Sequence, residues 1–125
     1  VWVGARGGEA VRQRPLPVSI GCSDCAFRTP IREALQQAGI EWRSASEVTN
    51  TSAQVATVAA DIAVMAWMAS TVPEGLEVLG RDSGLPPLPP FTVNLYLPRD
   101  GGDHIVQELA RHIRDAVAGP RRMVA

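Results

Sequence analysis

The feature that most constrains the fold is a run of apolar residues near the middle of the chain. Residues 62–69 are continuously apolar, and the run lies between Asp61 and Ser70. Such a run is typical of a strand buried on both faces of a parallel sheet. It is far shorter than the roughly 20 residues that a membrane-spanning helix needs. We therefore predict a central strand over residues 62–68.

Strand and helix patterns alternate before this run. Strand patterns occupy residues 1–5, 17–20 and 42–48. One helix is predicted from Thr29, as N-cap, to residue 38, with a possible earlier start near Ala26 and a stop at Gly39. A second helix follows the polar cluster 50–52 and runs to about residue 60. This order predicts an α/β fold, a mainly parallel βαβαβ sheet with helices on both faces.

The chain changes in character after the central strand. A short edge strand is predicted over residues 76–79, an extended proline-rich connector over 85–90 and a last strand over 91–97. A helix then opens at residues 101–103, and residues 119–125 are expected to form a flexible tail. The helix carries an apolar stripe that consists of Ile105, Val106, Leu109, Ile113 and Val117.

Composition narrows the class of protein. The 125 residues are 46% hydrophobic and carry a formal net charge of −1, which predicts one folded domain without a basic face for a polyanion. Two cysteines and no signal-peptide pattern favour the cytoplasm. The sequence opens on Val1-Trp2-Val3, a strand pattern already under way, so we expect the chain to be a fragment.

The order and spacing of several segments resemble one known family. The segments are residues 2–5, 15–18, 25–28, 34–35, 38–39, 42–43, 50–52, 58–64, 72–79 and 105–117. Together they resemble the second regulatory subdomain of LysR-type transcriptional regulators, and the resemblance covers nearly the whole chain. Asp61 and Ala63 depart from it, because the family usually has glycines there.

The resemblance implies both an architecture and a function. Residues 1–98 would form one lobe of a type II periplasmic-binding-protein-like fold, including its hinge strands, and residues 99–118 a helix that normally packs on the other lobe. A small anionic effector would bind in the interlobe cleft without catalysis or cofactor, and DNA would bind only through a winged helix-turn-helix missing from this chain. The helix over residues 26–38 and the preceding strand are candidates for dimerisation. A fragment of a solute-binding protein is an alternative with the same architecture.

The residues themselves point to the same site. In an open parallel sheet, ligands lie beyond the carboxyl ends of the strands, where helices begin. Segments 21–25, 49–52 and 68–71 fit this description, and the helix start at 50–52 could hold a carboxylate on its free amides. The alternative is that these residues only cap their helix, and Trp67 could equally fill the core. The candidate ligand-binding residues are Cys22, Ser23, Asn50, Thr51, Ser52, Trp67 and Met68.

Cys22-Ser23-Asp24-Cys25 adds a second hypothesis. A C-x-x-C after a strand and before a helix is also the context of a redox pair, so Cys22 and Cys25 could form a redox-sensing module. The Trp and Gly-Pro of thioredoxin-type motifs are missing, which favours two reduced thiols instead. Two cysteines do not complete a zinc site, and no catalytic triad or phosphate loop is present, so we predict neither a metal site nor an enzyme.

Overall fold

The computed structural model describes residues 1–118, and it divides into two compact units. Unit 1 is Val1–Pro89 and unit 2 is Pro90–Ala125. Unit 1 contains five strands, two α-helices and three short 3₁₀ helices, whereas the described part of unit 2 contains one α-helix. The α/β class predicted from the sequence is therefore confirmed.

The strands of unit 1 form two small sheets. β2 (Leu16–Ile20) pairs in parallel with β3 (Trp42–Glu47), and β1 (Trp2–Ala5) pairs antiparallel with both β4 (Met65–Ala66) and β5 (Leu76–Val78). One parallel bridge, Val18 to Val64, joins the two sheets. The strands are thus mixed in direction rather than mainly parallel. An apolar strand pattern reports burial and not direction, so the orientation of β1 could not be read from it.

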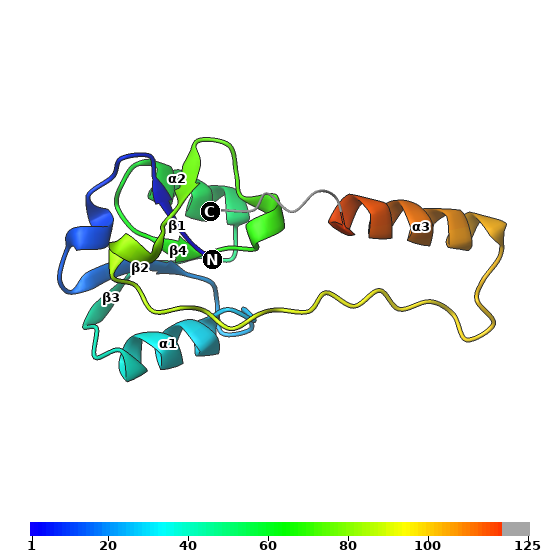
Figure 1. Cartoon of the computed structure of the whole chain (residues 1–125), viewed down its shortest axis with the longest axis horizontal. Coiled ribbons are helices and arrows are strands. Elements are labelled where there is room, and N and C mark those ends of the chain that lie inside the picture. The colour runs from blue at the N-terminus through cyan, green and yellow to red at the C-terminus, as the bar shows by residue number, and fades with distance from the viewer. Residues whose placement is uncertain (119–125) are drawn as a thin grey trace. The chain divides into compact units, whose positions relative to one another are not determined.

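Two helices cover opposite faces of these strands (Figure 1). Ile31 and Leu35 of α1 (Arg28–Gln37) belong to one apolar cluster with Trp2 of β1, whereas Val58 of α2 (Thr51–Ala59) belongs to another with Val3. Successive residues of a strand point to opposite faces, so neighbours Trp2 and Val3 serve the two cores. Helices on both faces are confirmed. α1 begins at Arg28, so the predicted N-cap, Thr29, lies inside the helix.

The apolar run forms a shorter strand than predicted. Only Met65–Ala66 is paired as β4, although Val64 also exchanges backbone hydrogen bonds with β2, to Pro17 (2.9 Å) and from Ser19 (2.8 Å). Ile62 is 52% exposed, because the chain is still leaving α2 at that point. Trp67 and Met68 follow the strand in a half-buried loop. The strand predicted over 62–68 is therefore too long at both ends.

Asp61 takes a position that usually requires glycine. Its φ is +56°, in the left-handed region, which Asp tolerates better than most residues. Its carboxylate accepts hydrogen bonds from the amides of Glu9 (2.8 Å) and Ala10 (3.0 Å) and so anchors the 3₁₀ helix η1 (Ala10–Arg12). Asp61, where the resembled family usually has glycine, therefore holds η1 in place through its carboxylate.

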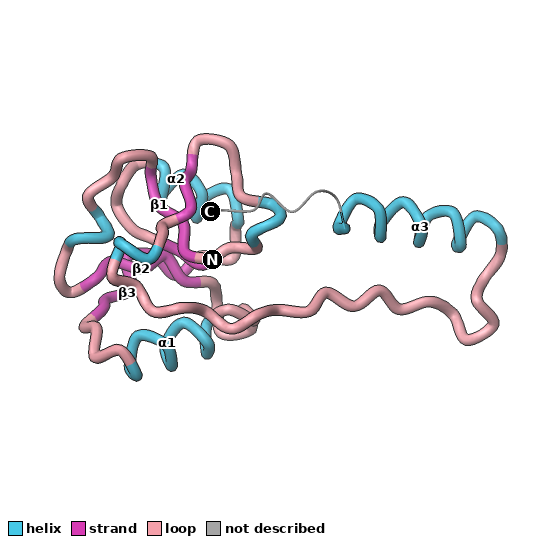
Figure 2. The backbone as a smooth tube through the Cα atoms, in the orientation of Figure 1, coloured by secondary structure: helices cyan, strands magenta, loops and turns pink. Residues whose placement is uncertain are grey.

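Unit 2 confirms one prediction and contradicts another. α3 (His104–Ala118) begins after Asp103, whose Oδ1 accepts from the amide of Val106 at 2.9 Å, and its apolar stripe is exposed at Ile105 (74%) and Leu109 (59%). Residues 91–97 are loop, not the predicted last strand (Figure 2). A strand needs a ladder partner, and no strand of the described chain forms a ladder with this segment.

The predicted tail, 119–125, lies outside the described residues. In residues 1–118, no helix has the length and apolar character to cross a membrane.

Candidate functional site

The three segments expected to hold a ligand meet at one cavity in unit 1. The loops that follow β2, β3 and β4 bring them together, and the cavity has a volume of about 280 Å³. This volume lies just below the roughly 300–1,000 Å³ found for small-molecule sites. The cavity is lined by Gly21, Cys22, Cys25, Phe27, Val48, Thr49, Thr51, Gln54, Ala66, Trp67, Met68 and Thr71.

Some of the predicted ligand-binding residues line this cavity and others do not. The structure places Cys22, Thr51, Trp67 and Met68 in its wall, together with Cys25 of the redox hypothesis. The lining does not include Ser23, Asn50 or Ser52.

Two of the three residues outside the lining have local roles instead. The Asn50 side chain accepts a hydrogen bond from the amide of Ala53 at 3.0 Å, which makes it the N-cap of α2. The hydroxyl of Ser23 donates to Asp24 at 3.0 Å on the surface. The capping alternative therefore describes the side chain of Asn50.

Sequence reasoning missed several lining residues. Thr49 and Thr71 lie inside the expected segments, so the pattern could have supplied them. Gln54 gave no signal, because it stands one turn inside the helix. Its Nε2 donates to the carbonyl oxygen of Val48 at 2.9 Å and ties α2 to the end of β3. Phe27 was also missed, because it lies in the turns that precede α1.

Trp67 is held in place at both its ring and its backbone. Its indole Nε1 donates to the carbonyl oxygen of Thr71 at 2.7 Å, which closes the loop after β4. Its backbone amide donates to the carbonyl oxygen of Val1 and its carbonyl oxygen accepts from the amino group of Val1, both at 2.9 Å. The ring is therefore a fixed part of the wall.

The start of α2 supplies the polar end of the cavity. Its first amides, those of Thr51 and Ser52, have no partner within the helix, and they carry the positive end of the helix dipole. None of the twelve lining residues is charged. An anion in this cavity would therefore depend on the helix amides and on neutral donors such as the hydroxyl of Thr51.

The other wall of the cavity is built around Gly21. A β-carbon at this position would lie 2.5 Å from Cβ and 2.6 Å from Sγ of Cys25, so only glycine allows the observed packing. The carbonyl oxygen of Gly21 accepts from Nη1 of Arg28 at 2.9 Å, and Arg28 also pairs with Glu47 at 3.4 Å. These contacts fix the turn that carries both cysteines against the end of β2.

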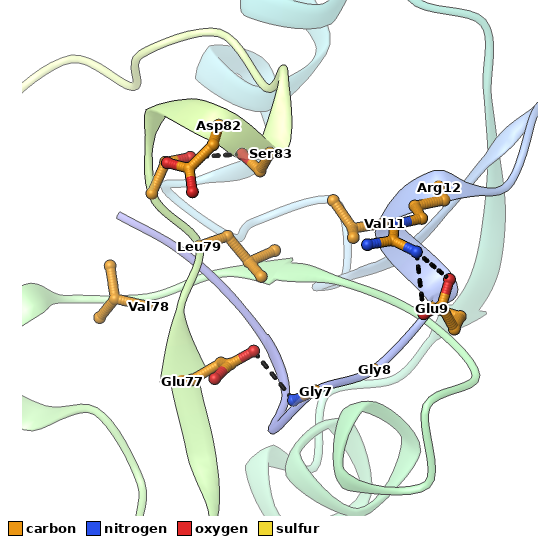
Figure 3. Close-up of a pocket in the computed structure, with 11 residues that line it drawn as sticks. Gly7, Gly8, Glu9, Val11, Arg12, Glu77, Val78, Leu79, Asp82 and Ser83 are labelled. Atoms are coloured by element: carbon orange, nitrogen blue, oxygen red, sulfur yellow. Dashed lines mark hydrogen bonds and ion pairs between the residues drawn. The ribbon is translucent and has the colours of Figure 1, made fainter.

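Two further cavities in unit 1 are weaker candidates for a ligand-binding site. One, of about 400 Å³, has acidic and glycine-rich walls whose polar groups are engaged with one another (Figure 3): Glu77 accepts from the amide of Gly7 at 3.0 Å, and Glu9 pairs with Arg12 at 2.9 Å. The other, of about 550 Å³, lies between α1 and the proline-rich segment 86–89. Neither contains a residue predicted to bind a ligand. Within residues 1–118, no group of three or more His, Cys, Asp or Glu side chains could hold a metal ion.

The sequence is similar to that of a bacterial transcription regulator. That relative is the HTH-type transcriptional regulator DgdR of Burkholderia cepacia, which is 30% identical to this chain over 114 residues. The aligned region makes up 91% of this chain and 39% of the relative, so the chain spans about two-fifths of the regulator's length. No protein-family model matches the chain. The similarity agrees with the resemblance to a transcription regulator seen in the sequence.

Proposed function

We propose that this chain is the effector-sensing part of a LysR-type transcription regulator of the bacterial cytoplasm. It binds a small carboxylate in the cavity between the ends of β2, β3 and β4, without catalysis. The observation that carries the proposal is the convergence of Cys22, Thr51, Trp67 and Met68 on one cavity. The similarity to a transcription regulator supports the wider role.

The lining of the cavity favours a particular kind of ligand. Phe27, Val48, Ala66, Trp67 and Met68 provide an apolar surface, and the start of α2 provides amide and hydroxyl donors at one end. A short aliphatic or aromatic acid matches this division, because its apolar body leaves water while its carboxylate keeps hydrogen bonds. The absence of a charged side chain from the lining favours a monoanion over a dianion.

In the regulator, this cavity is one wall of a larger site. The second wall would come from the other lobe, and the helix-turn-helix that binds DNA would lie in the part of the regulator that this sequence does not include. A ligand that contacts both lobes favours their closed arrangement and thereby shifts the regulator between two states. The ligand changes DNA binding because its affinity for the closed arrangement differs from its affinity for the open one.

Unit 2 supplies the second element of the proposal. The apolar stripe of α3 is exposed along its length, at Ile105, Leu109, Ile113 and Val117. Large apolar side chains are also exposed in the preceding loop, among them Val93 and Tyr96. We infer that this unit completes the other lobe, where α3 covers a core and the loop segment 91–97 finds a strand partner.

Calorimetric titration of the chain tests the binding step. The ligands are short aliphatic monocarboxylates, from propionate to hexanoate, with their α-hydroxy and α-amino derivatives. We expect saturable binding of at least one series, and a loss of affinity of about five- to tenfold in Thr51→Val, which removes one hydroxyl donor and keeps the side-chain volume. The absence of binding across the whole series would contradict the proposal.

The matched control is Ser52→Ala on the same turn of α2. Ser52 carries a hydroxyl and a helix-start amide like Thr51, but its side chain does not line the cavity. The variant keeps the amide and should bind as the unaltered chain does. Equal losses in both variants would indicate an effect on the helix as a whole rather than a contact in the cavity.

A further inference from the structure

We propose that Cys22 and Cys25 are a reversible oxidation site, at which a hydroperoxide converts two thiols in the wall of the cavity into one disulfide. Both residues are free thiols in the structure, both are half-buried, and both line the cavity.

The backbone between the two cysteines brings them within bonding range. The amide of Cys25 donates to the carbonyl oxygen of Cys22 at 3.0 Å, so residues 22–25 form one hydrogen-bonded turn. The end residues of such a turn have Cα atoms less than about 7 Å apart. Disulfides join Cα atoms about 4.4–6.8 Å apart, so the backbone of this turn keeps the two cysteines within the Cα separation that a disulfide spans.

The surroundings of the turn hold it in this form. The backbone amide of Arg28 donates to the carbonyl oxygen of Cys25 at 2.9 Å, which forms a second turn, and the Arg28 side chain donates to the carbonyl oxygen of Gly21. Cys25 packs directly over Gly21, where no larger residue would fit. Asp24 and Ser23 are exposed, so an oxidant can reach the turn from solvent.

The chemistry balances with one hydroperoxide per chain. One thiolate attacks the peroxide oxygen, the O–O bond breaks, and a sulfenic acid forms as water or an alcohol leaves. The second thiol then attacks the sulfenic sulfur, the S–S bond forms, and a water molecule is released. Two thiols lose two protons and two electrons in total, and a dithiol reductant returns them. The reduced and oxidised chains then present different walls to a ligand.

Mass spectrometry of the whole chain under non-reducing conditions tests the site, with hydrogen peroxide as the probe. We expect a monomer that has lost two hydrogens, with no titratable thiol, and full recovery of both thiols on addition of dithiothreitol. Cys22→Ser and Cys25→Ser should each fail to give this product. Two thiols that remain titratable, or products limited to oxygen adducts and disulfide-linked dimers, would overturn the proposal.

A second measurement asks whether the folded turn accommodates the bond. If it does, the disulfide forms at least as readily in the folded chain as in the unfolded one, and by thermodynamic linkage the oxidised chain is no less stable. We therefore expect the urea midpoint of unfolding to stay the same or rise on oxidation. A lower midpoint would overturn the proposal. Neither measurement uses a carboxylate, so the oxidation site can fail while the binding site stands, and the reverse.

Discussion

Replacement of Gly21 by alanine tests how tightly the cavity wall is packed. The new β-carbon would lie 2.5 Å from Cβ and 2.6 Å from Sγ of Cys25. Favourable carbon contacts lie near 3.5–4.0 Å, so the turn that carries Cys25 must move by about an ångström. The φ of Gly21 is outside the left-handed region, so the backbone itself accepts alanine. The effect of Gly21→Ala is therefore steric.

The expected loss of stability follows from two opposing effects. Overpacking of a close-packed site costs about 1–3 kcal/mol. Alanine also restricts the unfolded chain, which returns about 0.4–1 kcal/mol. We expect Gly21→Ala to lower the free energy of unfolding by about 1.3 kcal/mol, the difference between the mid-range values of these two effects.

Urea unfolding followed by tryptophan fluorescence measures this loss. Trp2, Trp42 and Trp67 all belong to unit 1, so the signal reports the unit that contains the substitution. A double-mutant cycle identifies the clash. Cys25→Gly removes both crowded atoms and should recover about 1 kcal/mol in the Gly21→Ala background, whereas Cys25→Ala leaves the 2.5 Å contact in place. A neutral Gly21→Ala, or equal rescue by both changes at Cys25, would refute the reasoning.

Three further predictions concern other parts of the chain. Asp61→Ala should lower the free energy of unfolding in urea by about 2–4 kcal/mol, because it removes two charge-assisted hydrogen bonds together with a residue suited to positive φ. Asp61→Gly should lower it less, because glycine also accepts positive φ. Equal losses in the two variants would contradict the backbone part of this reasoning. Trp2→Phe should lower the free energy of unfolding by about 1 kcal/mol and make the proline-rich segment easier to cleave, because the indole Nε1 of Trp2 donates to the carbonyl oxygen of Pro86 at 2.8 Å. A rate of proteolysis in residues 84–90 that does not change would contradict this. Leu109→Glu with Ile113→Glu should leave the urea midpoint of unit 1, followed by tryptophan fluorescence, unchanged, because both side chains are exposed on unit 2. A lowered midpoint would show that unit 1 depends on α3.

Periodic patterns located most elements of the chain because they record burial. Ile31 and Leu35 of α1 lie four residues apart, on one face of the helix, and both are buried against the strands. The same patterns did not give the direction of β1 or the short length of β4. Those properties depend on partners far along the chain, which a local window does not contain.

The segment 91–97 shows this dependence most clearly. Its apolar and β-branched residues have the composition of a strand, yet the segment is loop in the described chain. A strand is stable only beside another strand, so local preference without a partner does not decide the conformation.

The candidate site was predictable as a region and not as a set of side chains. The rule that ligands lie beyond the carboxyl ends of strands located the three loops that form the cavity. It could not separate Asn50, which caps α2, from Thr51, which lines the cavity, because the residue types that favour capping also favour anion binding. Gln54 was missed because a glutamine inside a helix has no distinctive pattern.

The most direct test of the central claim is an amide NMR titration of the chain with the same carboxylates. The proposed function predicts saturable shifts that are largest at the backbone amides of Thr51 and Ser52 and at the indole N–H of Trp67, and small around Gly7 and Glu77 at the other cavity. Shifts that centre on Gly7 and Glu77, or that spread over the surface and never saturate, would contradict it.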